Sequence, residues 1–301
     1  MRKITPTRTL TSPTLSEAYT DFILSRQSMQ CSAATLEFYR HTAFIFLYWT
    51  ESQSVHSPKE INARHVRGYL AELTDRKLSD WTVNDHARAI RTLLKFFHAE
   101  GYMPAPTKFA MPRIAKKRLL VLSAVDVSKV LKSCSIREKL IVLLMVDTGL
   151  RRSEVVNLDW SDVDINTGLT RVKKGKGGKA RSVVMGAITR RALLAYRRQV
   201  TDTRENAPII QASSGARLSG TGLLLMFRRI VKRTGIPMTP HSLRRTFVIL
   251  SLRAGMDPLH LQALLGHVSL EMVYHYAQMT DEDLLQAHSS FSPIDNLHKL
   301  K

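Results

Sequence analysis

Apolar residues recur every three or four positions through the first hundred residues, in four runs separated by polar stretches. This is the period of an amphipathic helix. The runs are Ala18, Phe22 and Ile23; Leu36, Tyr39, Ala43, Phe46 and Leu47; Val66, Tyr69, Leu70 and Leu73; and Ala89, Leu93, Leu94 and Phe97. The pattern predicts four helices between about residue 14 and residue 100, packed as a compact all-α domain.

Helix-start signals precede these runs. A Ser or Thr followed three residues later by Glu forms a capping box, and this pattern occurs at 14–17 and at 57–60, the second with a proline at the first helical position. Ser32 and Ser79 are further candidate N-caps. Gly101 stands where a C-cap glycine would end the last of the four helices.

Residues 101–122 break the helical pattern. They contain three prolines, which interrupt helices, and the basic run Lys116, Lys117 and Arg118. We therefore predict an interdomain linker over residues 104–118. Its basic run is either part of a solvated tether or a contact for a phosphate backbone.

The remainder of the chain combines helices with one short hairpin. A helix is expected to begin at Ser123, and the strongly apolar stretch 136–146 is expected to form the core helix of a second domain. Residues 170–174 and 181–185 are typical of short strands and flank a glycine-rich turn, which predicts a β-hairpin with a basic tip. Helices are expected to predominate from there to about residue 290.

These elements predict a mainly α protein of two domains with a small β-hairpin. A chain of 301 residues is long enough for two domains. We expect a helical domain over residues 13–103, the linker over 104–118, a mixed α+β domain over 119–290 and a C-terminal tail over 291–301.

The charge balance narrows the choice of partner. The chain has 45 Lys and Arg against 25 Asp and Glu, a net charge of +20. Residues 1–100 contribute 13 basic against 10 acidic side chains, and residues 101–301 contribute 32 against 15, so the second part carries most of the excess. The balance predicts an acidic partner, most simply nucleic acid, although a ribosomal-type basic protein would show the same excess.

Several other classes are disfavoured. Cys31 and Cys134 stand alone, so no disulfide framework or zinc motif is expected. No apolar run is long enough to span a membrane, and the N-terminus lacks a signal-peptide pattern, so a reducing cytoplasm is the expected location. No metal site is expected, because the histidines of the last third do not follow an H-E-x-x-H or similar ligand pattern; they include His241, His260, His267 and His275.

Four separated stretches of the second half carry the candidate chemistry. They are 148–154 (TGLRRSE), 175–180 (GKGGKA), 241–244 (HSLR) and 266–279 (GHVSLEMVYHYAQM). The glycine-rich turn lacks the spacing of a P-loop and is not followed by a helix. His241 and Arg244 lie three positions apart and therefore share a helix face.

Together these stretches supply the side chains needed for metal-free attack on a phosphodiester. The transition state spreads negative charge over non-bridging oxygens, which arginine stabilises well because its guanidinium is planar and always charged. A lysine can protonate the leaving oxygen, and a tyrosine can form a covalent intermediate that stores the bond energy.

Four motifs in order resemble those of the tyrosine recombinases, the integrase family of site-specific recombinases; they are TGLRRSE, GKGGKAR, HSLRRTF and LGHVSLEMVYHY. The length of the chain is similar to that of the Xer-type members. The resemblance covers nearly the whole chain and implies a helical core-binding domain, a linker and a catalytic domain. It implies a catalytic set with Tyr276, nine residues after the LGH histidine, as the nucleophile. The implied set is Arg151, Lys176, His241, Arg244, His267 and Tyr276, with Glu154 one helical turn from Arg151 and able to orient it.

Some of these roles have a second candidate residue within the same motif. Tyr274 is the alternative nucleophile, although two residues of helix turn it to the other side, where packing is expected. Lys179 competes with Lys176 for the role of proton donor. Arg152 and Arg245 duplicate the motif arginines. Contacts to the DNA backbone are expected from Lys116, Lys117, Arg118, Lys174, Lys179 and Arg245.

The resemblance also implies a reaction and an assembly. The protein would cleave and rejoin double-stranded DNA at specific recombination sites through a 3′-phosphotyrosyl link, without metal, ATP or other cofactor. It would act as a homotetramer on synapsed DNA, with a second recombinase or an accessory protein as a further candidate partner. Residues 280–297 would dock on a neighbouring protomer, and the short stretch before Thr14 leaves little room for a separate arm-binding domain.

Integration, excision and resolution of a mobile element or replicon share these residues, so the biological context stays open at this point. Two other functions remain as alternatives. One is a type IB topoisomerase, which would relax supercoils on DNA that lacks any particular site. The other is a catalytically inactive DNA-binding accessory protein.

Overall fold

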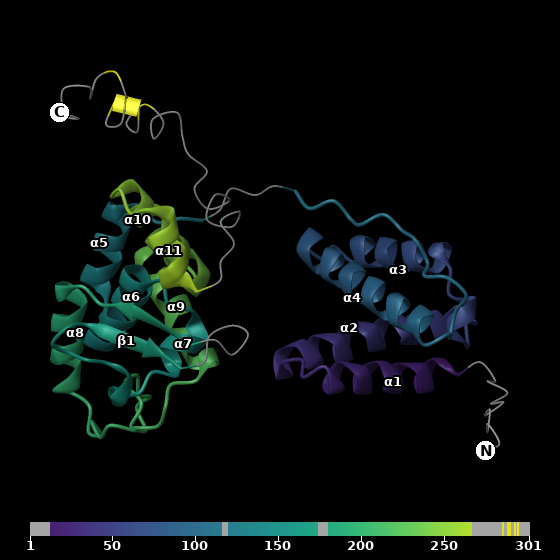
Figure 1. The fold of residues 1–301 in the computed structure, drawn as a ribbon, viewed down its shortest axis with the longest axis horizontal. Coiled ribbons are helices and arrows are strands. Elements are labelled where there is room, and N and C mark those ends of the chain that lie inside the picture. The colour runs from purple at the N-terminus through teal and green to yellow at the C-terminus, as the bar shows by residue number, and fades with distance from the viewer. Residues whose placement is uncertain are drawn as a thin grey trace, which may run out of the picture. The chain divides into compact units, whose positions relative to one another are not determined.

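The computed structural model describes residues 13–115, 120–173 and 180–266, together with Leu285, His288, Ser289, Ser292 and Ile294. The chain divides into two compact units, Met1–Lys117 and Arg118–Lys301 (Figure 1). No helix in the described ranges is long and apolar enough to cross a membrane.

Over residues 13–115 the first unit is helical without strands, as the periodicity predicts. This range contains α1 (Leu15–Ser28), α2 (Ala33–Ser52), α3 (Ala63–Asp75) and α4 (Asp80–Ala99). The side chains of Thr14, Ser32 and Ser79 cap α1, α2 and α4 as expected. Gly101 follows α4 with a φ of +77°, a conformation that favours glycine. The apolar faces meet in one core, which includes Phe22, Phe46, Tyr69, Leu93 and Phe97.

One predicted helix start is wrong. The Ser57 hydroxyl donates to Glu60 Oε1 at 2.6 Å, but these residues form only a 3-10 turn, η1 (Pro58–Glu60). Buried Ile61 follows in an extended conformation. Helix α3 begins at Ala63, after Asn62, whose side chain accepts from the backbone N–H groups of the first turn. The capping pattern involves only neighbouring residues. The burial of Ile61 in the core requires an extended backbone at this position, so no helix continues from Glu60.

Much of the segment expected to be a linker packs on the first unit. The Thr107 hydroxyl donates to the carbonyl oxygen of Ile61 at 3.1 Å, and Asn84 donates to that of Pro112 at 3.0 Å. The Arg91 guanidinium lies 5.5 Å from the centre of the Phe109 ring. This part of residues 104–115 is therefore bound to the helices rather than being a solvated tether.

The second unit combines helices with a hairpin (Figure 1). Its helices are α5 (Ala124–Ser133), α6 (Ile136–Thr148), α7 (Arg152–Val156), α8 (Ala187–Arg197), α9 (Gly220–Thr234), α10 (Pro240–Arg253) and α11 (Pro258–Leu265), with the 3-10 turn η2 (Trp160–Asp162). The antiparallel strands β1 (Leu169–Val172) and β2 (Arg181–Val184) pair Leu169 with Val184 and Val172 with Arg181. The predicted hairpin is confirmed; residues 174–179 of its turn lie outside the described residues.

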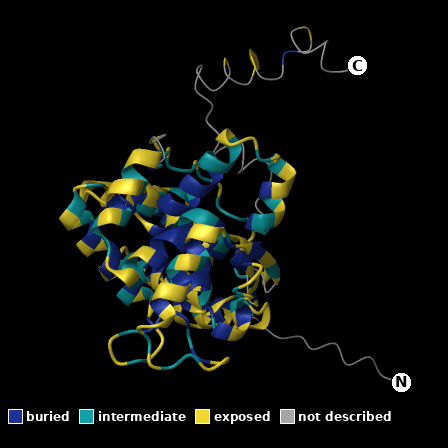
Figure 2. Cartoon of the chain, turned by 90° about the vertical axis from the view of Figure 1, so that its left-hand side faces the viewer, coloured by how far each residue is buried: buried dark blue, intermediate teal, exposed yellow. Residues whose placement is uncertain are grey.

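Helix α6 is the centre of this unit, as its apolar sequence predicts. Leu140, Ile141, Leu144 and Met145 are at most 1% exposed, and the helix packs against α8 and α10. Figure 2 shows buried residues where helices face one another and exposed residues along the outer faces. This core supports the loop after α6, where the first charged motif begins.

Candidate functional site

The end of α6 sets the position of the first motif arginine. Gly149 ends the helix with a φ of +63°, and a Cβ there would lie 2.4 Å from Cδ1 of the Phe247 ring. Only glycine allows both the left-handed backbone and this close approach. The chain then turns so that Arg151 becomes the residue before α7.

Arg151 is held by the acidic residue three positions later. Its backbone N–H donates to Glu154 Oε2 at 2.7 Å, and its Nη1 donates to Oε1 at 2.9 Å. Glu154 and Arg151 are therefore in direct contact. The Arg151 side chain keeps 23% of its surface exposed, whereas that of Glu154 keeps 2%.

A second arginine, from β2, binds the same carboxylate. Arg181 donates from Nη1 to Glu154 Oε1 at 2.6 Å and from Nη2 to Oε2 at 2.8 Å. Its Nε donates to the carbonyl oxygen of Leu264 at 2.9 Å. The sequence prediction gave Arg181 no role, because its partner lies 27 residues away and no helical or strand period links the two. The available signal was its place as the last residue of the GKGGKAR stretch, at the start of the second strand.

The two arginines decide the charge of Glu154. Burial alone would raise the pKa of this carboxyl. The hydrogen bonds from the Arg181 side chain and the Arg151 backbone outweigh burial and lower its pKa from 4.5 to about 2. Glu154 is therefore ionised at neutral pH, between two guanidinium groups.

Arg244 joins three parts of the second unit. It lies in the first half of α10, a helix capped by Thr239, and is only 7% exposed. Its Nη1 donates to the carbonyl oxygen of Gly149, and its Nη2 donates to that of Leu265 at 2.9 Å. The guanidinium thus satisfies carbonyl groups at the ends of α6 and α11, which are unpaired within their own helices.

His241 lies one turn before Arg244 and is exposed at the surface. Partial loss of hydration lowers the pKa of its ring, and the positive charges of four arginines lower it further; these are Arg245, Arg244, Arg152 and Arg151. The imidazole is therefore neutral at pH 7 and keeps one N–H to donate. The structure brings the predicted residues Arg151, His241 and Arg244 together, with Arg152 and Arg245 in the same positive field.

The other predicted site residues lie outside the described residues; they are Lys116, Lys117, Arg118, Lys174, Lys176, Lys179, His267, Tyr274 and Tyr276. Their described neighbours are well anchored. Lys173 Nζ lies 2.8 Å from Asp162 Oδ1, which holds the end of β1 against η2. Gly266 has a φ of +63°, and a Cβ there would lie 2.6 Å from Arg181 Cδ.

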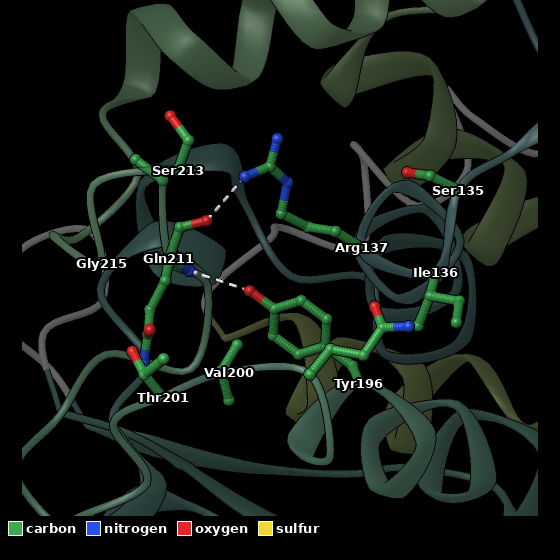
Figure 3. Close-up of a pocket in the computed structure, with 11 residues that line it drawn as sticks. Ser135, Ile136, Arg137, Tyr196, Val200, Thr201, Gln211, Ser213 and Gly215 are labelled. Carbon is green, nitrogen blue, oxygen red and sulfur yellow. Dashed lines mark hydrogen bonds between the residues drawn. The ribbon is translucent and has the colours of Figure 1, made fainter.

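A separate polar pocket lies at the opposite end of α6. It has a volume of about 360 Å³ and contains Arg137, whose Nη1 donates to the carbonyl oxygen of Gln211 at 2.9 Å (Figure 3). The Gln211 N–H in turn donates to the Tyr196 hydroxyl at 3.1 Å. The length of α6 separates this pocket from Gly149 by about 20 Å, so it is not part of the arginine site. Within the described ranges no group of three or more His, Cys, Asp or Glu side chains could hold a metal ion.

Comparison with known proteins identifies the family of the chain. Residues 117–283 match the phage integrase family. The chain is 32% identical to tyrosine recombinase XerA of Thermococcus onnurineus over 242 residues, which cover 79% of this chain and 85% of that protein. It is 27% identical to tyrosine recombinase XerC of Oceanobacillus iheyensis over 301 residues, covering 94% and 98%.

The chain belongs to the phage integrase family. This member of the family is therefore a site-specific DNA recombinase of the tyrosine class, as its four ordered motifs predict.

Solved structures show the same fold. The Tn1549 transposon integrase, in complex with transposon right end DNA, matches with a TM-score of 0.75 and 18% identity over 93% of this chain and all of that one. A lambda integrase dimer bound to a COC′ core site matches with a TM-score of 0.73 and 20% identity over 88% and 95%. The predicted fold class, a two-domain recombinase rich in helices with one small sheet, is confirmed.

Proposed function

We propose that this recombinase cleaves and rejoins double-stranded DNA at specific sites through a 3′-phosphotyrosyl intermediate on Tyr276. The observation that carries the proposal is that the structure brings together residues of separate motifs. Arg244 donates to the carbonyl oxygen of Gly149, two residues before Arg151, and His241 lies one turn before Arg244 on the same helix. Such a set fits a phosphate whose negative charge grows in the transition state.

The proposed chemistry has two steps. The Tyr276 oxygen forms a bond to the scissile phosphorus as the bond to the 5′-oxygen breaks, and Lys176 donates the proton that the 5′-oxygen takes up. A 5′-hydroxyl from the partner strand then attacks the phosphotyrosine and releases the tyrosine. The covalent link conserves the bond energy, so neither ATP nor a metal ion is required.

Each charged residue has a distinct role in this proposal. Arg151 and Arg244 neutralise the non-bridging oxygens, and the neutral ring of His241 donates a hydrogen bond to one of them. His267 supports the same charge, and Glu154 orients Arg151.

The DNA partner is supported by charge and by fold. Residues 101–301 carry 32 basic against 15 acidic side chains, which suits a phosphate backbone. The Tn1549 and lambda integrases of the same fold are described bound to DNA. Residues 13–103 would be the core-binding domain and 119–290 the catalytic domain, with the linker over 104–118 and the tail over 291–301.

The proposed assembly is a tetramer on two synapsed sites, in which residues 280–297 dock on a neighbouring protomer. A second recombinase or an accessory protein could complete the assembly. The reaction would integrate, excise or resolve DNA of a mobile element or replicon. Truncation after about residue 281 should abolish cooperative synapsis, and intact synapsis would refute the docking.

Covalent trapping tests the chemistry. DNA fragments from around the gene carry a nick near candidate sites, so that the cleaved strand diffuses away, and the reaction contains EDTA. We expect an adduct on a denaturing gel that survives Tyr274→Phe and disappears with Tyr276→Phe. An adduct lost only with Tyr274→Phe would assign the nucleophile two residues earlier, and tight binding without any adduct would favour an inactive accessory protein.

Supercoil relaxation separates recombination from topoisomerase activity. Plasmids with and without the trapped site are incubated with the protein. The proposal predicts strand exchange that depends on the site. Efficient relaxation of a plasmid that lacks the site would instead support a type IB topoisomerase.

A further inference from the structure

Arg181 and Arg151 share one buried carboxylate, but they hold it differently. Arg181 donates from Nη1 to one oxygen of Glu154 at 2.6 Å and from Nη2 to the other at 2.8 Å. Among the hydrogen bonds of the described residues, the Arg151 side chain makes one to Glu154, through Nη1. The Arg181 side chain is 8% exposed and that of Arg151 is 23% exposed.

We propose that Arg181 is a positioning residue that keeps Arg151 available to the scissile phosphate by occupying the carboxylate of Glu154. The inference rests on the proposed function, in which Arg151 neutralises a non-bridging oxygen. Arg181 does not itself touch the DNA in this proposal; it acts through Glu154.

The charges explain why a second cation is needed. Glu154 and Arg151 alone would form a neutral pair, and a buried carboxylate favours a bidentate guanidinium. Arg151 would then turn an edge of its guanidinium, with two N–H groups, toward Glu154. Its charge would be neutralised there, and those two N–H groups would no longer point toward a phosphate. With Arg181 present the cluster carries one net positive charge, located on the more exposed guanidinium.

The surroundings of Arg181 are rigid enough for this role. Its Nε donates to the carbonyl oxygen of Leu264 in α11 at 2.9 Å, and Gly266 lies close against its Cδ. The side chain therefore links β2, to which it belongs, with α7 and α11. A side chain that links three elements can keep the Glu154 carboxylate occupied and in place.

The test uses two substitutions of Arg181 in the full-length protein. Arg181→Met removes the cation, and Arg181→Lys keeps a charge but loses the bidentate fork. We expect Arg181→Met to slow adduct formation at saturating DNA by roughly 10 to 100-fold, with unchanged DNA affinity, and Arg181→Lys to fall between it and the wild type. Thermal unfolding of each variant verifies that it is folded.

A double variant separates positioning from a general structural defect. If Arg181 acts by occupying Glu154, removing the carboxylate charge should release Arg151 in the absence of Arg181. Arg181→Met combined with Glu154→Gln should therefore form adduct about 10-fold faster than Arg181→Met alone. The matched control is Arg233→Met, which breaks the 2.8 Å pair with Glu138 and should leave the rate unchanged.

The outcomes distinguish the two proposals. A wild-type adduct on Tyr276 with a double variant no faster than Arg181→Met would overturn the positioning role alone. A wild-type protein that forms no adduct on Tyr276 would overturn the proposed function, and the positioning role with it. An Arg181→Lys variant as fast as the wild type would show that charge suffices and would overturn the role of the bidentate fork.

Discussion

The guanidinium of Arg244 donates a hydrogen bond to the carbonyl oxygen of Leu265 at 2.9 Å. Leu265 is the last residue of α11 and lies two positions before His267 in the sequence. Since Arg244 also donates to Gly149, one buried side chain joins the first, third and fourth motifs. The geometry of the site is therefore sensitive to changes at Arg244 and at the ends of α6 and α11.

Glu154→Gln should strongly destabilise the second unit. The substitution leaves the nearly buried guanidinium of Arg181 without its counter-charge, and breaking a buried pair costs about 3 kcal/mol or more. Urea denaturation at neutral pH measures the free energy of unfolding. The matched control is Glu138→Gln, whose partner Arg233 is 43% exposed, and which should cost about 1 kcal/mol or less. Equal losses for the two variants would contradict the expectation.

The stabilising effect of Glu154 should disappear in acid. Its pKa in the folded protein is about 2, below the ordinary value of 4.5, so the folded state binds fewer protons than the unfolded state. The stabilisation is fully present above pH 4.5 and is lost as the pH falls from 4.5 to 2. Denaturation of the wild type and Glu154→Gln at several pH values in this window should show the difference in unfolding free energy shrinking. A difference that stays constant would show that ionisation of Glu154 does not stabilise the fold.

His241 should titrate below the ordinary histidine pKa of 6.5, because partial loss of hydration and the neighbouring arginines disfavour its charged form. Proton NMR of the ring follows this titration. Arg245→Gln should raise the pKa toward 6.5, and should raise it more than Arg152→Gln, because Arg245 has the larger influence of the two. A midpoint above 6.5 in the wild type would place His241 outside the positive field.

Gly149→Ala should destabilise far more than Gly235→Ala. Both glycines have positive φ values, +63° and +69°, so each substitution costs about 1 kcal/mol of backbone strain. A Cβ at Gly149 also collides with the Phe247 ring, whereas one at Gly235 meets nothing within 4 Å. We expect a total cost of about 3 kcal/mol for Gly149→Ala from this overpacking. Thermal and urea unfolding of the two variants provide the comparison, and similar losses would count against a tight packing of Gly149.

Local spacing in the sequence was enough for the helices and for the family. The caps of Thr14, Ser32 and Ser79, the apolar run of α6 and the glycine that ends it all act within one or two helical turns. The Ser57 pattern shows the limit of such signals. Its side-chain bond to Glu60 forms, but the burial of Ile61 prevents a helix from following.

The sequence by itself therefore determined the order of elements, the two-part organisation of charge and the motif residues Arg151, His241 and Arg244 as candidates. Only the tertiary structure decided how they are held. Arg181 meets Glu154 across 27 residues, and Arg244 meets Gly149 across 95. Such contacts depend on how α6, α10, α11 and β2 pack, because a buried charge or carbonyl takes whichever partner the fold brings within hydrogen-bonding distance, and no periodicity along the chain specifies that partner.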